Sequence, residues 1–164
     1  MNRRQAIATI GTAAAVRAAP AARERFLGVW NLIRCQRTFR DGRIEYPYGE
    51  RAVGRITYDK AGRMSALLMK PGRRSTVAPG VSLLAGNASA EEIREAVDGF
   101  IAYYGTFDVD AAAVTVIHHV QACLVPSWVG TDLKRTYRFD GDRLVLTAAT
   151  PASVLEIIWE RERD

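Results

Sequence analysis

Short runs in which apolar and polar residues alternate fill most of the chain from Phe26 onward, and turn-forming residues separate these runs. Neighbouring side chains of a β-strand point to opposite faces, so the alternation is typical of strands that bury one face. Asp140-Gly141 lies between two such runs and is a strong hairpin signal. The pattern predicts eight or nine strands, at residues 26–39, 43–46, 52–58, 63–70, 106–109, 114–123, 131–139, 143–147 and 154–161.

One segment breaks the strand pattern and has helical spacing instead. Ser89 stands three residues before Glu92, which is the pattern of a capping box at a helix N-terminus, and Gly105 is a suitable stop. We therefore expect one long helix over residues 89–104, preceded by a loop over residues 71–86. Its apolar positions are Ile93, Ala96, Val97, Phe100, Ile101 and Tyr104.

Two architectures can hold these elements in the single domain that 164 residues allow. Eight antiparallel strands can close into a barrel whose interior holds one small ligand, with the helix as a lid or plug at one rim. An open β-sandwich is the alternative. Both are all-β folds with one long helix.

The positive charge of the chain is concentrated at its start. Three of the five net positive charges come from Arg3, Arg4 and Arg17, in a segment without acidic residues. Elsewhere the basic residues are interspersed with acidic ones and form no basic stripe, so no nucleic-acid partner is expected. No apolar run is long enough for a membrane-spanning helix, so we expect no membrane insertion.

Residues 1–21 have the features of an export signal, and residues 22–164 form the expected barrel domain. The paired arginines, a weakly apolar middle and small residues around Ala21 resemble a twin-arginine signal. This interpretation implies an exported or periplasmic protein. The alternative, an Ala-rich arm that stays on the protein, implies a cytoplasmic one.

The chain lacks the common motifs of cofactor and metal chemistry. It contains no P-loop, no Gly-x-Gly-x-x-Gly after a strand, no Gly-x-Ser-x-Gly and no His-Glu-x-x-His. His118 and His119 are adjacent on one expected strand and therefore diverge, so we expect no metal site. Cys35 and Cys123 could form a single bridge in an exported protein, but two half-buried thiols are the favoured interpretation.

Several motifs resemble those of a known family. Gly28-Val29-Trp30 resembles the Gly-x-Trp of lipocalins, in which the Trp closes one end of the barrel. The segments 41–47, 62–66, 104–106, 118–120, 128–132 and 159–161 resemble the bacterial and fungal lipocalin-like domain family. The resemblance implies a closed antiparallel, calycin-type barrel, small-molecule binding without a cofactor, and a C-terminal Arg161 packed on Trp30. Some relatives act in secondary metabolism as cyclases or isomerases.

Strand alternation predicts which side chains face the interior. In the Asp140-Gly141 hairpin, Tyr137 is expected opposite Leu144 and Arg135 opposite Leu146, which directs Tyr137 and Arg135 inward. An inward Arg is costly unless it meets an acid or a ligand anion. The alternatives are that the register of the hairpin slips or that Arg135 extends to a rim. On the run at residues 114–121, His118 shares the apolar face with Val116 and Val120, and His119 points outward.

Two specific functions fit these features, and a structural or interaction module is a third, less specific interpretation. The first is binding of a small apolar or aromatic molecule in the barrel. The alternative is a cofactor-independent isomerase or cyclase for a polyketide- or terpenoid-like substrate, with His118 and Arg135 as the catalytic residues. The sequence leaves open whether the chain is an enzyme and whether it forms an oligomer, such as a homodimer. The expected ligand-binding residues are Tyr46, Met64, Tyr103, Tyr104, His118, Trp128, Arg135 and Tyr137.

Overall fold

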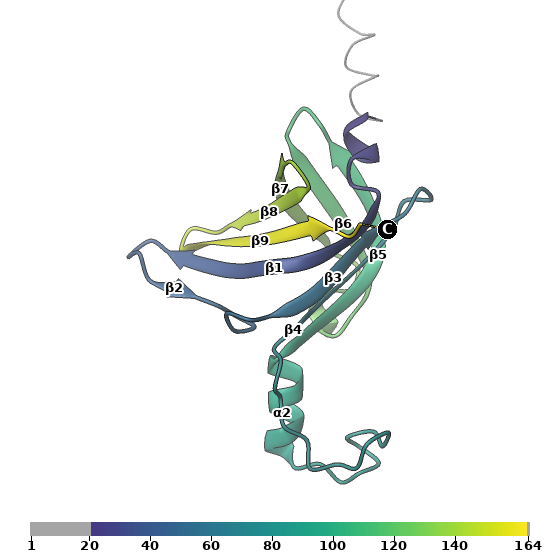
Figure 1. Cartoon of the computed structure of the whole chain (residues 1–164), viewed down its shortest axis with the longest axis vertical. Coiled ribbons are helices and arrows are strands. Elements are labelled where there is room, and N and C mark those ends of the chain that lie inside the picture. The colour runs from purple at the N-terminus through teal and green to yellow at the C-terminus, as the bar shows by residue number, and fades with distance from the viewer. Residues whose placement is uncertain (1–20, 164) are drawn as a thin grey trace, which may run out of the picture.

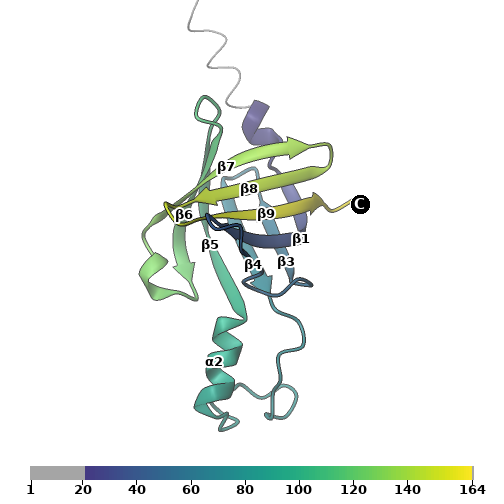
Figure 2. The same cartoon turned by 90° about the vertical axis from the view of Figure 1, so that its left-hand side faces the viewer.

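The computed structural model describes residues 21–163, which form an antiparallel β-barrel with a helical appendage (Figures 1 and 2). The barrel strands are β1 (Gly28–Phe39), β3 (Val53–Tyr58), β4 (Arg63–Met69), β5 (Phe100–Asp110), β6 (Thr115–Cys123), β7 (Asp132–Asp140), β8 (Arg143–Ala149) and β9 (Ser153–Arg161). The short β2 (Ile44–Glu45) pairs with β1 outside the barrel. Helix α2 (Ala90–Asp98) and the 3₁₀ turn η1 (Pro126–Trp128) lie in the connections.

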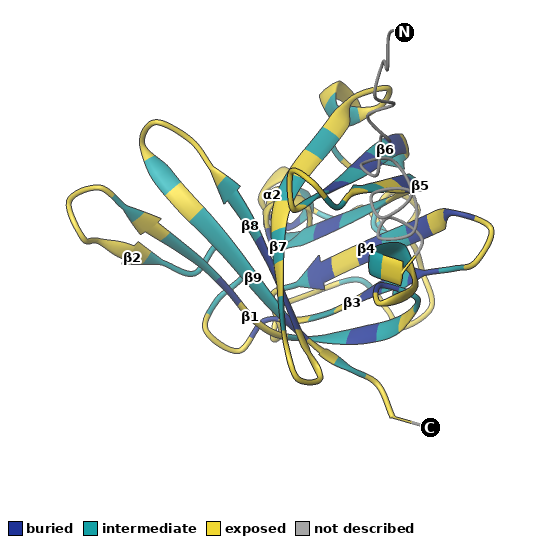
Figure 3. Cartoon of the chain, turned by 90° about the horizontal axis from the view of Figure 1, so that it is seen from above, coloured by how far each residue is buried: buried dark blue, intermediate teal, exposed yellow. Residues whose placement is uncertain are grey.

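Pairing of the first and last strands closes the sheet. Each barrel strand pairs with its neighbour along the chain, and β1 also pairs with β9, from Trp30 opposite Arg161 to Phe39 opposite Ser153. The expected closed barrel is therefore confirmed, and the sandwich alternative is excluded. Buried and more exposed positions alternate along strands such as β4, as Figure 3 shows by colour.

One end of the barrel is closed by an aromatic cluster. Phe26 is fully buried against Tyr58, Tyr137 and Phe139, with ring centroids 4.9–5.4 Å apart. The Trp30 indole donates a 2.7 Å hydrogen bond to the carbonyl oxygen of Phe26. The Arg161 guanidinium lies 4.0 Å from the centre of the Trp30 ring, so the expected pairing of these two residues is confirmed.

The helix is shorter than expected. Ser89 caps it as the sequence indicates, accepting a hydrogen bond from the Glu92 amide, but the helix ends at Asp98 and Gly99 caps it. The following residues pair with β4, from Phe100 opposite Met69 to Thr106 opposite Arg63, and belong to β5. Their helix-like apolar spacing was misleading because pairing with strands on both sides outweighs local periodicity.

Gly105 is a position of close backbone approach inside the sheet, where we had expected a helix stop. It lies beside an irregularity in the pairing of β5 with β6, and a Cβ atom at this position would overlap the carbonyl group of His119. Only glycine fits there without displacing one of the two strands.

Helix α2 is neither a lid nor a plug. Figures 1 and 2 show it extending away from the barrel, between the ends of β4 and β5. The Glu92 carboxylate accepts 2.7 Å hydrogen bonds from the amide and hydroxyl of Thr76, which tie the helix to its own preceding loop. The appendage is therefore stabilised mainly by local contacts.

Both cysteines in the structure are free thiols, as the favoured interpretation held, although Cys35 is fully buried rather than half-buried. The proposed export signal lies outside the described residues except for Ala21, so it stays a prediction. Among residues 21–163, no helix has the length and apolar character needed to cross a membrane.

Candidate functional site

A small cavity lies inside the barrel. Its volume is about 50 Å³, and all eight barrel strands contribute to its wall. Tyr48, from the β2–β3 connection, and Trp128, from η1, are the two lining residues outside the strands. The lining residues are Cys35, Tyr48, Ile56, Leu68, Ile101, Tyr103, His118, Trp128, Arg135, Leu146, Leu155, Ile157 and Trp159.

His118 is held between two tyrosines at the wall of this cavity. Its Nε2 lies 2.8 Å from the Tyr58 hydroxyl, and its Nδ1 lies 3.1 Å from the Tyr103 hydroxyl. The imidazole is 1% exposed, and burial together with the positive charge of Arg135 lowers its pKa to about 3. His118 is therefore neutral near pH 7, and it is a weak base.

The neighbouring hydroxyls and thiol are also poor acids. Burial raises the pKa of Tyr103 to about 12 and that of the Cys35 thiol to about 11. Burial raises the pKa of Tyr58 as well. All three groups keep their protons at neutral pH, so the site offers hydrogen bonds rather than a charged nucleophile.

Arg135 is the charged residue of the cavity. It is half-buried, and its Nη1 donates a 2.9 Å hydrogen bond to the carbonyl oxygen of Lys134. Within residues 21–163, no carboxylate forms an ion pair with it at 4.0 Å or less. The guanidinium therefore keeps hydrogen-bond donors available beside the cavity.

The strand register differs from the expected one by two residues. Tyr137 pairs with Leu146, and Phe139 pairs with Leu144. A shift of two residues leaves each side chain on the same face of the sheet, because strand alternation has a period of two. The inward direction expected for Arg135 and Tyr137 is therefore correct although the expected partners were wrong.

A family model for the lipocalin-like domain matches residues 27–163 of this chain. The chain belongs to the lipocalin-like domain family. The match covers the whole barrel, including Trp30 and Arg161 at the closed end.

A curated relative carries a more specific description. The 4'-hydroxy-3'-methoxypropiophenone carrier protein ppsC of Aspergillus oryzae is 35% identical over 94 residues. The aligned region spans 54% of this chain and 81% of the relative.

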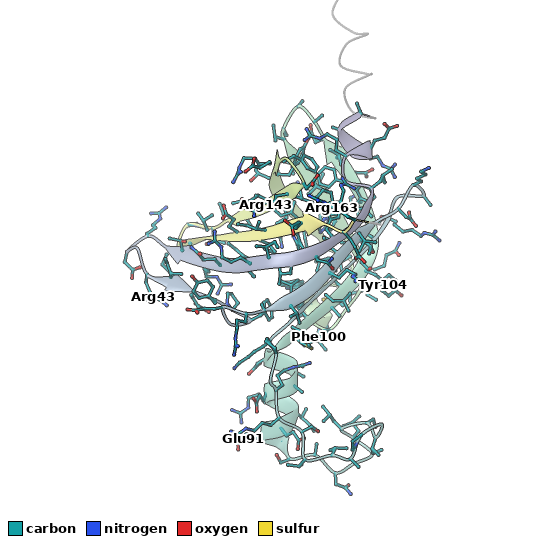
Figure 4. All side chains as sticks on the ribbon, viewed as in Figure 1. Arg43, Glu91, Phe100, Tyr104, Arg143 and Arg163 are labelled. Carbon is teal, nitrogen blue, oxygen red and sulfur yellow. The ribbon has the colours of Figure 1, made fainter. Side chains whose placement is uncertain are left out.

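Four of the expected ligand-binding residues line the cavity of this lipocalin-like barrel, namely Tyr103, His118, Trp128 and Arg135. The other four do not line it. Tyr46 lies in the β2–β3 connection, and Tyr104 is 56% exposed on the outer face of β5 (Figure 4). Met64 is buried in the core, and Tyr137 packs on Phe26 at the closed end.

The sequence reasoning missed several cavity residues. Tyr48 is of a residue type suited to lining a pocket, but the expected ligand-binding residues included Tyr46 and not Tyr48. The three inward residues of β9, Leu155, Ile157 and Trp159, were also outside the expected set. The alternation along β9 could have identified these three, because Trp159 already belonged to a family-like motif. Tyr48 carried no such signal, because the position of a loop residue depends on the fold.

His119 lies on the outer face of the barrel, as expected. Its Nδ1 is 2.6 Å from a carboxylate oxygen of Asp132, and its Nε2 is 3.1 Å from one of Asp108. The hydrogen bond to Asp132 is the main cause of its raised pKa. The described part of the chain contains no group of three or more His, Cys, Asp or Glu residues suited to a metal ion.

The two histidines are expected to alter stability in different pH ranges. The pKa of His118 is about 3 in the folded protein, below the ordinary value of 6.5. At a pH between these two values, His118 is protonated mainly in the unfolded chain. The free energy of unfolding should fall by up to about 1.4 kcal/mol per pH unit as the pH is lowered from 6.5 toward about 5. Urea unfolding at several pH values should show that His118→Gln removes this slope.

His119 provides the matched control, because its folded pKa is raised above 6.5. Its contribution is present below the unfolded pKa and is lost as the pH rises through the folded pKa. His119→Gln should therefore flatten the stability curve above pH 6.5 and leave the lower range unchanged. Equal slopes for the wild type and His118→Gln below pH 6.5 would contradict a buried, neutral His118.

Proposed function

We propose that this lipocalin-like protein binds a small, largely apolar aromatic molecule in the cavity of its barrel. The observation that carries the proposal is a mostly apolar wall on which a few polar groups converge, those of Tyr103, His118 and Arg135. Small-molecule sites in proteins typically combine an apolar lining with a small number of placed polar groups.

The name of the Aspergillus relative supports the same proposal. It describes a carrier of a substituted aromatic ketone, and the relative is 35% identical over 94 residues. An aromatic ring of this kind suits a wall built from Ile, Leu, Tyr and Trp side chains. No feature of the site favours the isomerase or cyclase alternative, since His118 is a weak base with both nitrogens near tyrosine hydroxyls.

The cavity must enlarge to hold such a ligand. Its volume of about 50 Å³ is well below the roughly 300 Å³ of typical small-molecule sites. Tyr48 and Trp128 belong to connections, whereas the remaining lining residues belong to hydrogen-bonded strands. Loop residues move more easily than strand residues, so we propose that these two aromatic side chains swing outward when the ligand enters.

Calorimetric titration of the full chain with 4'-hydroxy-3'-methoxypropiophenone tests the proposal. We expect one site per chain with a Kd of about 1 to 100 μM, and a negative heat-capacity change from apolar burial. Titration of the ligand into buffer alone and into an unrelated barrel protein serves as the control. The absence of binding up to about 1 mM ligand, together with failure of smaller aryl ketones to bind, would reject the proposal.

A further inference from the structure

One cavity residue carries a buried hydrogen-bond donor without a partner. The indole Nε1 of Trp159 is the buried side-chain nitrogen for which the described residues provide no acceptor. Trp159 is 1% exposed, lies on β9 and lines the cavity. Buried N–H groups are almost always paired in folded proteins, so an unpaired one at a binding cavity indicates a place for an acceptor.

The hydrogen bonds of His118 make a second donor available. Neutral imidazole has one donor and one acceptor nitrogen, and the Tyr58 hydroxyl has only His118 Nε2 within hydrogen-bond distance among residues 21–163. Tyr58 is 2% exposed, so its hydroxyl must donate to Nε2 or leave a buried proton unpaired. The proton of His118 is then on Nδ1 and is donated to the Tyr103 oxygen.

This arrangement leaves the Tyr103 hydroxyl proton without a protein acceptor. The Nδ1–H of His118 occupies one lone pair of the Tyr103 oxygen, at 3.1 Å, and no other hydrogen bond of this hydroxyl occurs within the described chain. Tyr103 lines the cavity, so a bound ligand can accept its proton.

The side chains that line the cavity include few competing acceptors. None of the lining residues is Asp, Glu, Asn or Gln, and Arg135 has only donors to offer. The polar chemistry of the cavity is therefore dominated by donors, namely the indole N–H of Trp159, the hydroxyl of Tyr103 and the guanidinium of Arg135.

We propose that the cavity selects ligands that place an oxygen acceptor, such as a ketone oxygen, beside an aromatic ring, and that Trp159 and Tyr103 determine this specificity. The inference rests on the proposed function and adds the hydrogen-bonding class of the ligand. A site that hydrogen-bonds its ligand discriminates strongly against an analogue lacking the polar atom, because the buried protein group is then left unpaired.

The test compares propiophenone with its alkene isostere, in which a methylene group replaces the ketone oxygen. The two molecules have nearly the same shape and differ in the acceptor. Calorimetry or ligand-detected NMR measures both dissociation constants for the wild type. We expect the ketone to bind at least about tenfold more tightly than the alkene, after correction for their difference in water-to-octanol transfer.

The ratio of the two dissociation constants, alkene over ketone, is then measured for three variants. Trp159→Phe and Tyr103→Phe each remove one donor and should reduce the ratio, whereas Tyr104→Phe changes a hydroxyl on the outer face and should leave it unchanged. Binding of the alkene reports that each variant still folds with an intact cavity. A reduced ratio in either donor variant supports the proposal.

Other results would overturn it. If both molecules bind the wild type equally, the cavity does not select an oxygen acceptor. If the wild type prefers the ketone but Trp159→Phe and Tyr103→Phe keep the same preference, these two residues do not determine the specificity. In both cases the proposed binding function stands. If neither molecule binds and 4'-hydroxy-3'-methoxypropiophenone also fails, both proposals are wrong.

Discussion

Trp30→Ala is expected to lower the free energy of unfolding by about 3–5 kcal/mol, the usual range for removing a buried Trp. Trp30 is 1% exposed, and its indole donates to the Phe26 carbonyl. The substitution opens a space at the closed end and removes the ring on which Arg161 stacks, a contact worth about 0.5–2 kcal/mol. Urea unfolding followed by far-ultraviolet circular dichroism measures the loss without relying on tryptophan fluorescence.

Trp128 supplies a control of the same residue type. It is half-buried on η1 at the wall of the cavity. Trp128→Ala therefore removes less buried surface than Trp30→Ala and should lower the free energy of unfolding clearly less. The loss in free energy of unfolding for Arg161→Met should lie between those of the two Trp variants. Arg161 also donates 2.6 Å hydrogen bonds to the carbonyl oxygens of Leu27 and Arg25, and the substitution removes these as well. A loss for Trp30→Ala no larger than that for Trp128→Ala would contradict the role of Trp30 as the closure of the barrel.

Leu155→Trp is expected to weaken binding of the aromatic ligand by about 10- to 100-fold. Leu155 is the third residue of β9 and lines the cavity, whose volume is about 50 Å³. The larger indole must occupy the space that the ligand needs, and relieving such overpacking costs about 1–3 kcal/mol. Calorimetric titration with 4'-hydroxy-3'-methoxypropiophenone measures the change in Kd.

Val154→Trp is the matched control, one residue earlier on the same strand. Val154 is 43% exposed and points away from the cavity, so the same side chain placed there should leave the Kd within about twofold. Thermal unfolding of both variants checks that each is folded at the titration temperature. Equal Kd values for Leu155→Trp and the wild type would show that the ligand binds elsewhere.

Much of the barrel could be predicted from sequence because strand alternation is a local property. The apolar face of residues 114–121 correctly placed His118 inside and His119 outside. The inward direction of Arg135 was also correct, even though its hairpin register was wrong by two residues. The error in register did not change the predicted direction of the side chains. A side chain changes face only when the register shifts by an odd number of residues, and this shift is even.

The end of the helix could not be located in the same way. The helical spacing continues from Ile93 through Tyr104, yet the structure places Phe100 and the residues after it in β5. Apolar residues at three- and four-residue intervals also occur in strands with mixed faces. Only the pairing of β5 with β4 and β6 determines which pattern applies.

The family motifs were enough to predict the closed barrel and its Trp30 and Arg161 end, and strand alternation was enough to predict the inward direction of His118 and Arg135. The size of the cavity, the two tyrosine partners of His118 and the unpaired indole of Trp159 became visible only in the folded barrel. These features join residues from β3, β5, β6 and β9, which are far apart in the chain. Their distances depend on how the closed barrel packs its side chains, and no local pattern records that packing.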